Sequence, residues 1–214
     1  MNTERLIEQL ARDVRPVRRH GVARRLAVGL VCGAAVSTAL LLLWMGPRPD
    51  LAAAMRGGVF WMKWGYTIAI ALIAALATIR LARPDDAGGE RWLWLLLAPV
   101  LLLAGAGVAE LLGAPQGMWL SMWLGHSWKS CPWRVLLLAL PIFVGLLWAF
   151  RRLAPTRLRA AGATAGLASG AFAATVYCLH CPEVSALFVL TWYSLGILLA
   201  AGLGALLGPR LLRW

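Results

Sequence analysis

The chain has 214 residues, of which 61% are hydrophobic and only 14% are charged. A soluble domain of this length does not need so apolar a core, and the composition is typical of a membrane protein. A formal net charge of +12 is compatible with nucleic-acid binding, but basic residues in a membrane protein first follow the positive-inside rule. The sequence contains no Walker loop, dinucleotide glycine pattern, zinc-protease motif or nucleophile elbow. Conventional catalysis is therefore not expected.

An amphipathic pattern occupies residues 3–14, and Pro16 closes it. Its apolar face consists of Leu6, Ile7, Leu10 and Val14. A helix of about twelve residues is marginal alone in water, so we expect it to become ordered against a partner or the bilayer. The pattern alone favours neither partner binding nor interfacial anchoring. The arginines that follow mainly direct topology, although they also suit an acidic protein surface. They are Arg15, Arg18, Arg19, Arg24 and Arg25.

Six apolar segments follow, and each is long enough to cross a hydrocarbon core of about 30 Å. They occupy residues 26–45, 60–79, 92–112, 133–150, 158–179 and 186–207. The sequence therefore predicts an all-α fold, an integral membrane bundle of six transmembrane helices over residues 26–208. A cytoplasmic N-terminal tail, residues 1–25, precedes the bundle, and a short cytoplasmic tail, residues 209–214, follows it.

The basic residues divide unevenly between the two ends of these segments. Sixteen of the 21 lie in the two tails or in the connections after the second and fourth segments. The other five are Arg48, Arg56, Lys63, Lys129 and Arg134. The positive-inside rule then places both termini in the cytoplasm and the remaining connections outside. Nucleic-acid binding becomes the weaker explanation of the charge.

Two cysteine–proline steps, at Cys131 and Cys181, each stand directly before an apolar segment. Each is preceded by a histidine, His126 or His180, and Glu183 follows the second step. If the two connections meet, these side chains offer enough sulfur, nitrogen and oxygen donors for a soft divalent metal ion. The alternative is a disulfide between Cys131 and Cys181 in an oxidising periplasm. The third interpretation is that Cys131 and Cys181 are ordinary loop cysteines without a function.

The other two cysteines give weaker signals. Cys178 forms a Cys-x-x-Cys pair with Cys181, but the pair straddles a helix end and no second such pair exists. Cys32 stands between Gly29 and Gly33, whose four-residue spacing lets another helix approach closely. We therefore interpret Cys32 as a small packing residue.

Two further patterns concern packing inside the bundle. Glu110 lies deep in the third segment, where a charge is expensive, and Lys63 is its candidate partner. A neutral or interfacial Glu110 is the simpler reading. The fifth and sixth segments carry small residues at four-residue spacing, which predicts close helix contact. These are Gly162, Gly166, Gly170, Gly204 and Gly208.

Taken together, these residues resemble a known family, the six-span membrane anti-sigma factors of the negative-regulator-of-sigma-F (NrsF) type from proteobacteria. The resemblance covers the full length. It rests on Thr3-Glu4-Arg5-Leu6-Ile7 leading into Asp13-Val14-Arg15-Pro16-Val17-Arg18-Arg19, on Gly125-His126-Ser127-Trp128-Lys129 with Cys131-Pro132, on His180-Cys181-Pro182-Glu183, on Trp192-Tyr193, and on Gly208-Pro209-Arg210-Leu211-Leu212-Arg213-Trp214.

The resemblance implies a protein that holds an extracytoplasmic-function sigma factor at the bacterial inner membrane until an envelope or metal stress relaxes the hold. Because oxidants also act on thiolates, oxidative stress is a second expected signal. It implies that Cys131 and Cys181 are the paired sensing positions. The residues beside them add His126, His180 and Glu183 as candidate co-ligands of a metal ion. It also favours a sigma-binding tail that uses Leu6, Ile7, Leu10, Val14, Arg15, Arg18 and Arg19. The partners are then the sigma factor and the lipid bilayer, with no direct contact to nucleic acid.

Two alternatives come from other classes of protein. A membrane thiol-quinone oxidoreductase would pass electrons from outer cysteines to a quinone, but it needs a second exchanging pair of thiols. Here Cys178 and Cys181 form the only close pair, and Cys32 is expected near the inner side. A metal-binding or transport protein would need polar ligands along its spans, which offer little beyond Glu110.

Overall fold

The computed structural model describes residues 3–12, 21–82, 89–151, 153 and 155–213. Within these ranges the chain is helical apart from its connections and contains no β-strand, as the sequence predicts. The long helices are α2 (Gly21–Leu40), α4 (Gly58–Leu81), α5 (Leu97–Gly113), α7 (Cys131–Phe150), α8 (Leu158–Tyr177) and α10 (Ser194–Leu211). The short ones are α1 (Thr3–Arg12), α3 (Leu51–Ala54), α6 (Trp119–Leu124) and α9 (Ala186–Phe188).

Several helices are extended by turns of different pitch. A π-helical turn, Leu41–Met45, prolongs α2, and another, Val189–Tyr193, joins α9 to α10 without a break. A 3₁₀ segment, Gly89–Leu96, leads into α5, and Gln116–Met118 forms a 3₁₀ turn before α6. With these extensions, a helix covers most of each of the six apolar segments, so the predicted positions of the long helices are confirmed.

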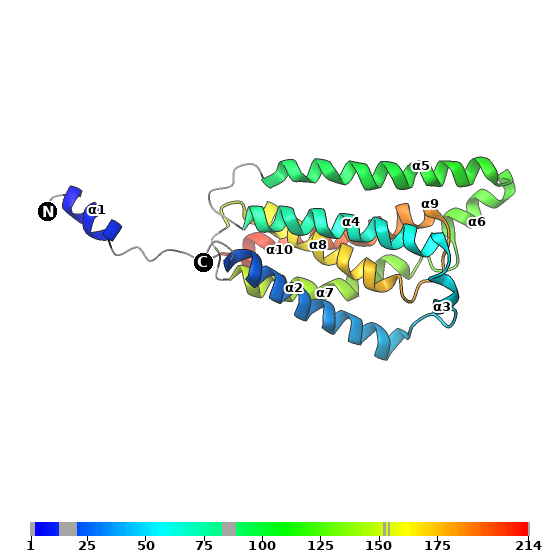
Figure 1. Ribbon diagram of the computed structural model, residues 1–214, viewed down its shortest axis with the longest axis horizontal. Helices are drawn as coiled ribbons and strands as arrows, with labels where there is room; N and C mark the ends of the chain where they lie inside the picture. The colour runs from blue at the N-terminus through cyan, green and yellow to red at the C-terminus, as the bar shows by residue number, and fades with distance from the viewer. Residues whose placement is uncertain (1–2, 13–20, 83–88, 152, 154, 214) are drawn as a thin grey trace.

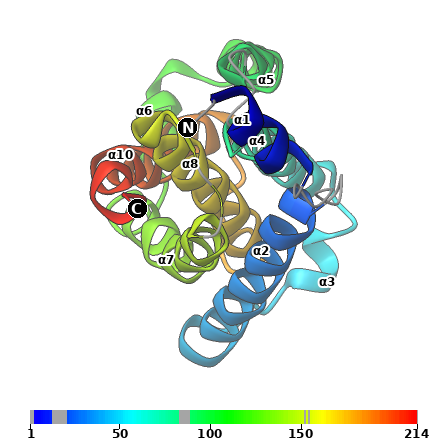
Figure 2. The same ribbon diagram turned by 90° about the vertical axis from the view of Figure 1, so that its left-hand side faces the viewer.

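Helix α8 lies in the middle of the bundle, with α10, α7, α2 and α4 around it (Figure 1 and Figure 2). Twelve of its 20 residues are buried, mostly alanine and glycine. A Cβ added at Gly162 would meet the carbonyl oxygen of Gly204, and one added at Gly166 would meet that of Ala200. The close helix contact predicted from the glycine spacing is therefore confirmed. We call this contact between α8 and α10 the glycine seam.

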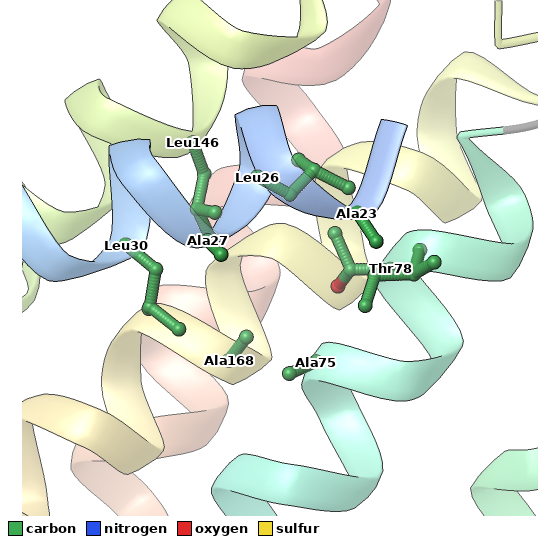
Figure 3. Close-up of a pocket in the computed structure, with 9 residues that line it drawn as sticks. Ala23, Leu26, Ala27, Leu30, Ala75, Thr78, Leu146 and Ala168 are labelled. Atoms are coloured by element: carbon green, nitrogen blue, oxygen red, sulfur yellow. The ribbon is translucent and has the colours of Figure 1, made fainter. Parts of the chain in front are cut away.

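Helix α2 packs along α7 in a similar way. A Cβ at Gly29 would meet the main chain at Gly145, and one at Gly33 would meet the main chain at Ile142. Against α4, by contrast, α2 leaves an apolar cavity of about 90 Å³ (Figure 3). The cavity is lined by Ala23, Leu26, Ala27, Leu30, Ala75, Thr78, Ile79, Leu146 and Ala168. In the bundle α2 therefore belongs with α7 more closely than with α4.

Five helical stretches of the described chain are long and apolar enough to cross a membrane. They are Gly21–Met45, Gly58–Leu81, Arg91–Gly113, Cys131–Phe150 and Ala186–Leu211. Helix α8 is not among them, because its small residues give it a lower hydropathy. Leucine side chains at the positions of these small residues would not fit, because other helices already surround α8. The central position of α8 thus accounts for its composition.

Helix α5 lies along one side of the bundle, next to α4 (Figure 1). It exposes large apolar side chains along its length, among them Leu101, Leu102, Val108 and Leu112. Such a row suits contact with lipid chains. At one end of the molecule, α3, α6 and α9 gather with the connections that precede α7 and follow α8 (Figure 1). We call this the loop end.

Candidate functional site

The two cysteine–proline steps come together at the loop end. Cys131 is the first residue of α7, and Cys181 lies in the connection between α8 and α9. Both side chains are 0% exposed, and both belong to one apolar cluster that also holds Cys178. Helix α8 ends at Tyr177, so Cys178 and Cys181 both lie in the connection that follows it, and the pair does not straddle the helix end as expected.

All four cysteines carry free thiols in this structure, and Cys32 is exposed on α2. In the part of the chain that the structure describes, no three His, Cys, Asp or Glu side chains group closely enough to hold a metal ion. The donor set therefore does not fit a metal ion in this arrangement. The loops would have to rearrange before Cys131, Cys181 and the candidate co-ligands shared one ion.

Glu183 joins the two loops. Its carboxylate oxygen Oε1 accepts hydrogen bonds from the main-chain N–H of His126 at 2.8 Å and of Ser127 at 3.0 Å. The hydroxyl of Ser127 donates a third bond to the same oxygen, at 3.0 Å. The side chain of Glu183 is only 9% exposed, so these bonds offset the cost of burying its charge. His126 thus contributes its backbone to the site.

Gly125 makes this approach possible. Its φ of +56° lies in the region that favours glycine, and a Cβ at this position would collide with the carboxylate of Glu183 and the ring of Phe188. The glycine before His126 therefore lets the loop turn directly over the carboxylate. Sequence alone shows the glycine, but it does not show the carboxylate that requires it.

Lys63, in the second turn of α4, holds the same connection from the other side. It is 1% exposed, and its ammonium donates hydrogen bonds to the carbonyl oxygens of Cys181 at 3.1 Å and Glu183 at 2.6 Å. Lys63, the candidate partner of Glu110, is therefore not its partner in the structure. The Glu110 carboxylate instead accepts bonds from the Ser185 hydroxyl and from the N–H of Ala186, at 3.0 and 2.9 Å. Free N–H groups at the start of α9 attract it there.

His180 links the site to α7 and to the connection that follows the π-helical turn after α2. Arg134 of α7 donates to its Nε2 over 3.1 Å, so Nδ1 carries the proton and donates to the carbonyl of Gly46 at 2.9 Å. One residue earlier, the carbonyl of Leu179 accepts a bond from the N–H of Arg48, at 2.9 Å. The connection after α2 is thereby tied to the connection after α8. The imidazole of His180 therefore holds these chain segments in position.

Two buried tyrosines complete the cluster. Tyr177 and Tyr193 are both 0% exposed, and their ring centroids lie 5.6 Å apart. Within the described chain neither hydroxyl has a hydrogen-bond partner. Unpaired buried hydroxyls are rare and costly. Sequence reasoning missed them, because nothing in a lone tyrosine signals that its hydroxyl will be buried.

The expected sigma-binding residues lie far along the chain from this cluster. Helix α1 covers Thr3–Arg12, which confirms the amphipathic helix over nearly its predicted length. Ile7, on its apolar face, is 62% exposed. An exposed apolar side chain on an amphipathic helix is available to bind another surface. Four of the expected residues lie outside the described part of the chain: Val14, Arg15, Arg18 and Arg19.

The apolar helices indicate a membrane protein of the helical-bundle class. The family described as negative regulator of sigma F matches residues 10–214, and the chain belongs to this family. It is 40% identical to a probable anti-sigma-F factor of Azospira oryzae and 41% identical to an anti-sigma-F factor of Caulobacter vibrioides, with 100% of each chain covered. No solved structure matches the chain. By their names, both relatives are regulators rather than enzymes.

Proposed function

We propose that the protein is a membrane-bound anti-sigma factor. It sequesters an extracytoplasmic-function sigma factor at the inner membrane and releases it when thiols at the loop end react under metal or oxidative stress. The observation that carries the proposal is family membership over residues 10–214, together with two relatives, matched over their full length, that are named anti-sigma-F factors. The sensing part is supported by the place of the two thiols, because Cys131 and Cys181 are both free and belong to one cluster at one end of the bundle.

The proposed topology has six spans, with α8 as the fifth and both termini in the cytoplasm. Helix α8 is 20 residues long, as is α7. It is surrounded by α10, α7, α4 and α2. The division of basic residues, sixteen against five, supports the orientation. Reporter fusions at Asp86 and Gln116 test it, because they should report opposite sides of the membrane. Cytoplasmic signals from both would refute the topology.

The proposed sigma-binding element is the tail, with the apolar face of α1 in a groove of the sigma factor. Leu10→Asp should release the partner, since burying an unpaired carboxylate costs several kcal/mol. Arg18→Ala should have a much smaller effect, because an exposed ion pair is worth about 1 kcal/mol at most. The measurement is sigma-dependent transcription in the native host. Full repression with Leu10→Asp would exclude the tail as the binding element.

The proposed sensor is the pair of thiols in the cysteine–proline steps. Cys131→Ser and Cys181→Ser should each abolish the transcriptional response to cadmium or peroxide, while membrane levels of the protein stay unchanged. Cys32→Ser is the matched control, because this thiol is exposed on α2, whereas Cys131 and Cys181 lie in the buried cluster. Cys178→Ser is expected to respond nearly normally, although this thiol shares the cluster. A normal response in the double variant of Cys131 and Cys181 would show that other groups sense the stress.

The structure offers a route from the thiols to the tail. Helix α7 begins at Cys131 and packs closely along α2, and α2 continues from the tail at its far end. A movement of α7 that follows thiol chemistry would therefore carry α2 with it. Small energies suffice, because a hundredfold change in partner affinity needs only about 2.8 kcal/mol.

A further inference from the structure

Lys63 is a buried cation whose hydrogen bonds go to the main chain. Both of its acceptors are carbonyl oxygens of the Cys181–Glu183 segment, at 3.1 and 2.6 Å. Within the described residues it forms no ion pair. Burying an ammonium group costs several kcal/mol unless hydrogen bonds satisfy it. The position of these two carbonyls is therefore tied to the position of the charge, and the segment is fastened to α4.

Glu183 extends this attachment to the other loop. Its carbonyl accepts from Lys63, while its carboxylate accepts from the backbone and hydroxyl of Ser127. The carbonyl of Ser127 in turn accepts a hydrogen bond from the N–H of Cys131, at 2.9 Å. A continuous path of bonds thus runs from α4 through both cysteine loops to the start of α7. We call Lys63 and Glu183, with these bonds, the Lys63–Glu183 clamp.

We propose that Lys63 and Glu183 are positioning residues that hold the two cysteine loops closed in the state that retains the sigma factor. The inference rests on the proposed function. In the clamped arrangement the thiols of Cys131 and Cys181 are both free and both fully buried. A reagent must reach a thiol before it reacts, so the closed arrangement is the unreacted, resting state. In an anti-sigma factor the resting state is the one that holds its partner.

Weakening the clamp then shifts the population toward open loops without any stress. The effect does not depend on thiol chemistry, since neither clamp residue is a cysteine. Lys63→Met removes the cation with little change in size, and Glu183→Gln removes the charge at nearly constant volume. Lys63→Arg keeps a cation with several donors and should preserve most of the clamp. Lys129→Met is the matched control, because the Lys129 ammonium lies over the Trp128 ring, 5.3 Å from its centroid, and no bond of the clamp involves it.

The first experiment measures thiol reactivity in native membranes from the producing host. The full chain carries Cys32→Ser and Cys178→Ser, so that Cys131 and Cys181 are the remaining thiols, and a maleimide polymer reports each modification as a mass shift. Lys63→Met and Glu183→Gln should raise the labelling rate at least about tenfold, which corresponds to about 1.4 kcal/mol in the opening equilibrium. Lys63→Arg and Lys129→Met should label close to the parent rate.

Ser127→Ala keeps the test decisive even if the charge variants accumulate poorly. It removes one of the three donors to the Glu183 carboxylate and leaves both charges in place. A smaller rise in labelling, severalfold, is expected. Parent-like protection of both thiols in Ser127→Ala and in whichever charge variants reach the membrane would overturn the clamp.

The second experiment measures sigma-dependent transcription without stress. Lys63→Met and Glu183→Gln should raise the basal level, and Lys63→Arg should restore repression. If labelling rises while transcription stays repressed, the clamp holds the loops and it is the proposed control of the sigma factor by these loops that fails. If labelling and basal transcription are both unchanged while stress still induces the response, the clamp is refuted and the proposed function stands.

Discussion

Along the glycine seam between α8 and α10, backbone lies against backbone, whereas at the loop end hydrogen bonds between distant chain segments join the elements. The seam consists of Gly162, Gly166 and Gly170 facing Ala200, Gly204 and Gly208. At the loop end, Lys63, Glu110 and Glu183 each bond to main-chain groups more than 50 positions away. The first kind of contact depends on shape, and the second depends on charge and on donors that need acceptors.

The difference matters for how each region can change. A closely packed seam has essentially one arrangement, because a helix that slides loses its fit everywhere at once. A set of hydrogen bonds between loops can open at one point without breaking the fit of the seam. We therefore expect the seam to contribute most to the stability of the fold, and the loop end to change when the protein responds to stress.

The largest effect should come from filling the seam. Gly162→Leu would drive its side chain into the carbonyl of Gly204, and overpacking against backbone should cost on the order of 3 kcal/mol. Gly202→Leu is the control on α10, since a Cβ there meets nothing within 4 Å. Unfolding of the purified chain in detergent, followed by circular dichroism, measures both. Equal stability of the two variants would mean that the seam is not packed as described.

Removing a carboxylate at the loop end should have an intermediate effect. Glu110→Ala leaves the Ser185 hydroxyl and the N–H of Ala186 without their acceptor at the start of α9. Losing a charged hydrogen bond at a helix N-terminus should cost about 2 kcal/mol. The same unfolding measurement applies. The helices of the seam should keep their packing, so the loss should appear as faster hydrogen exchange confined to residues 183–190.

Two tyrosines should respond in opposite ways to the loss of a hydroxyl. The Tyr66 hydroxyl is hydrogen bonded to Ser194 at 2.6 Å, so Tyr66→Phe should cost about 1 kcal/mol. The Tyr193 hydroxyl has no partner in the described chain, so Tyr193→Phe should leave stability unchanged or raise it slightly. A loss from Tyr193→Phe as large as that from Tyr66→Phe would reveal a partner for the buried hydroxyl.

The smallest effect concerns a surface ion pair next to the loop end. The Arg48 guanidinium donates hydrogen bonds of 2.7 and 2.6 Å to Asp50, which lowers the pKa of that carboxyl below its ordinary value. A lowered pKa stabilises the fold above the ordinary carboxyl range, and the contribution disappears as the pH falls through the lowered value. Asp50→Asn should therefore be slightly less stable than the parent at neutral pH, and the difference in Tm should vanish in acid. A difference that persists in acid would point to another cause.

The sequence was sufficient to predict the helices and the glycine faces of the seam, because both follow from local patterns. Runs of apolar residues located the long helices, and four-residue glycine spacing marked α8 and α10 as helices with a closely packed face, although it did not say that they pack on each other. The clamp was not predictable in the same way. Lys63 and Glu183 are 120 positions apart, and either could have served topology or solubility alone. Their roles depend on which loops meet, and no local pattern encodes that.

The composition of α8 has a consequence for biosynthesis. A segment rich in alanine and glycine partitions only weakly into lipid, and α8 leaves the ribosome before α10, the helix that covers its glycines. In the proposed topology, α8 should therefore wait beside the insertion machinery until α10 follows, and the two should enter as one hairpin. A nascent chain ending at residue 185 should fail to integrate α8. One ending at residue 157 should integrate its four earlier spans normally, because each of them is apolar enough to enter alone.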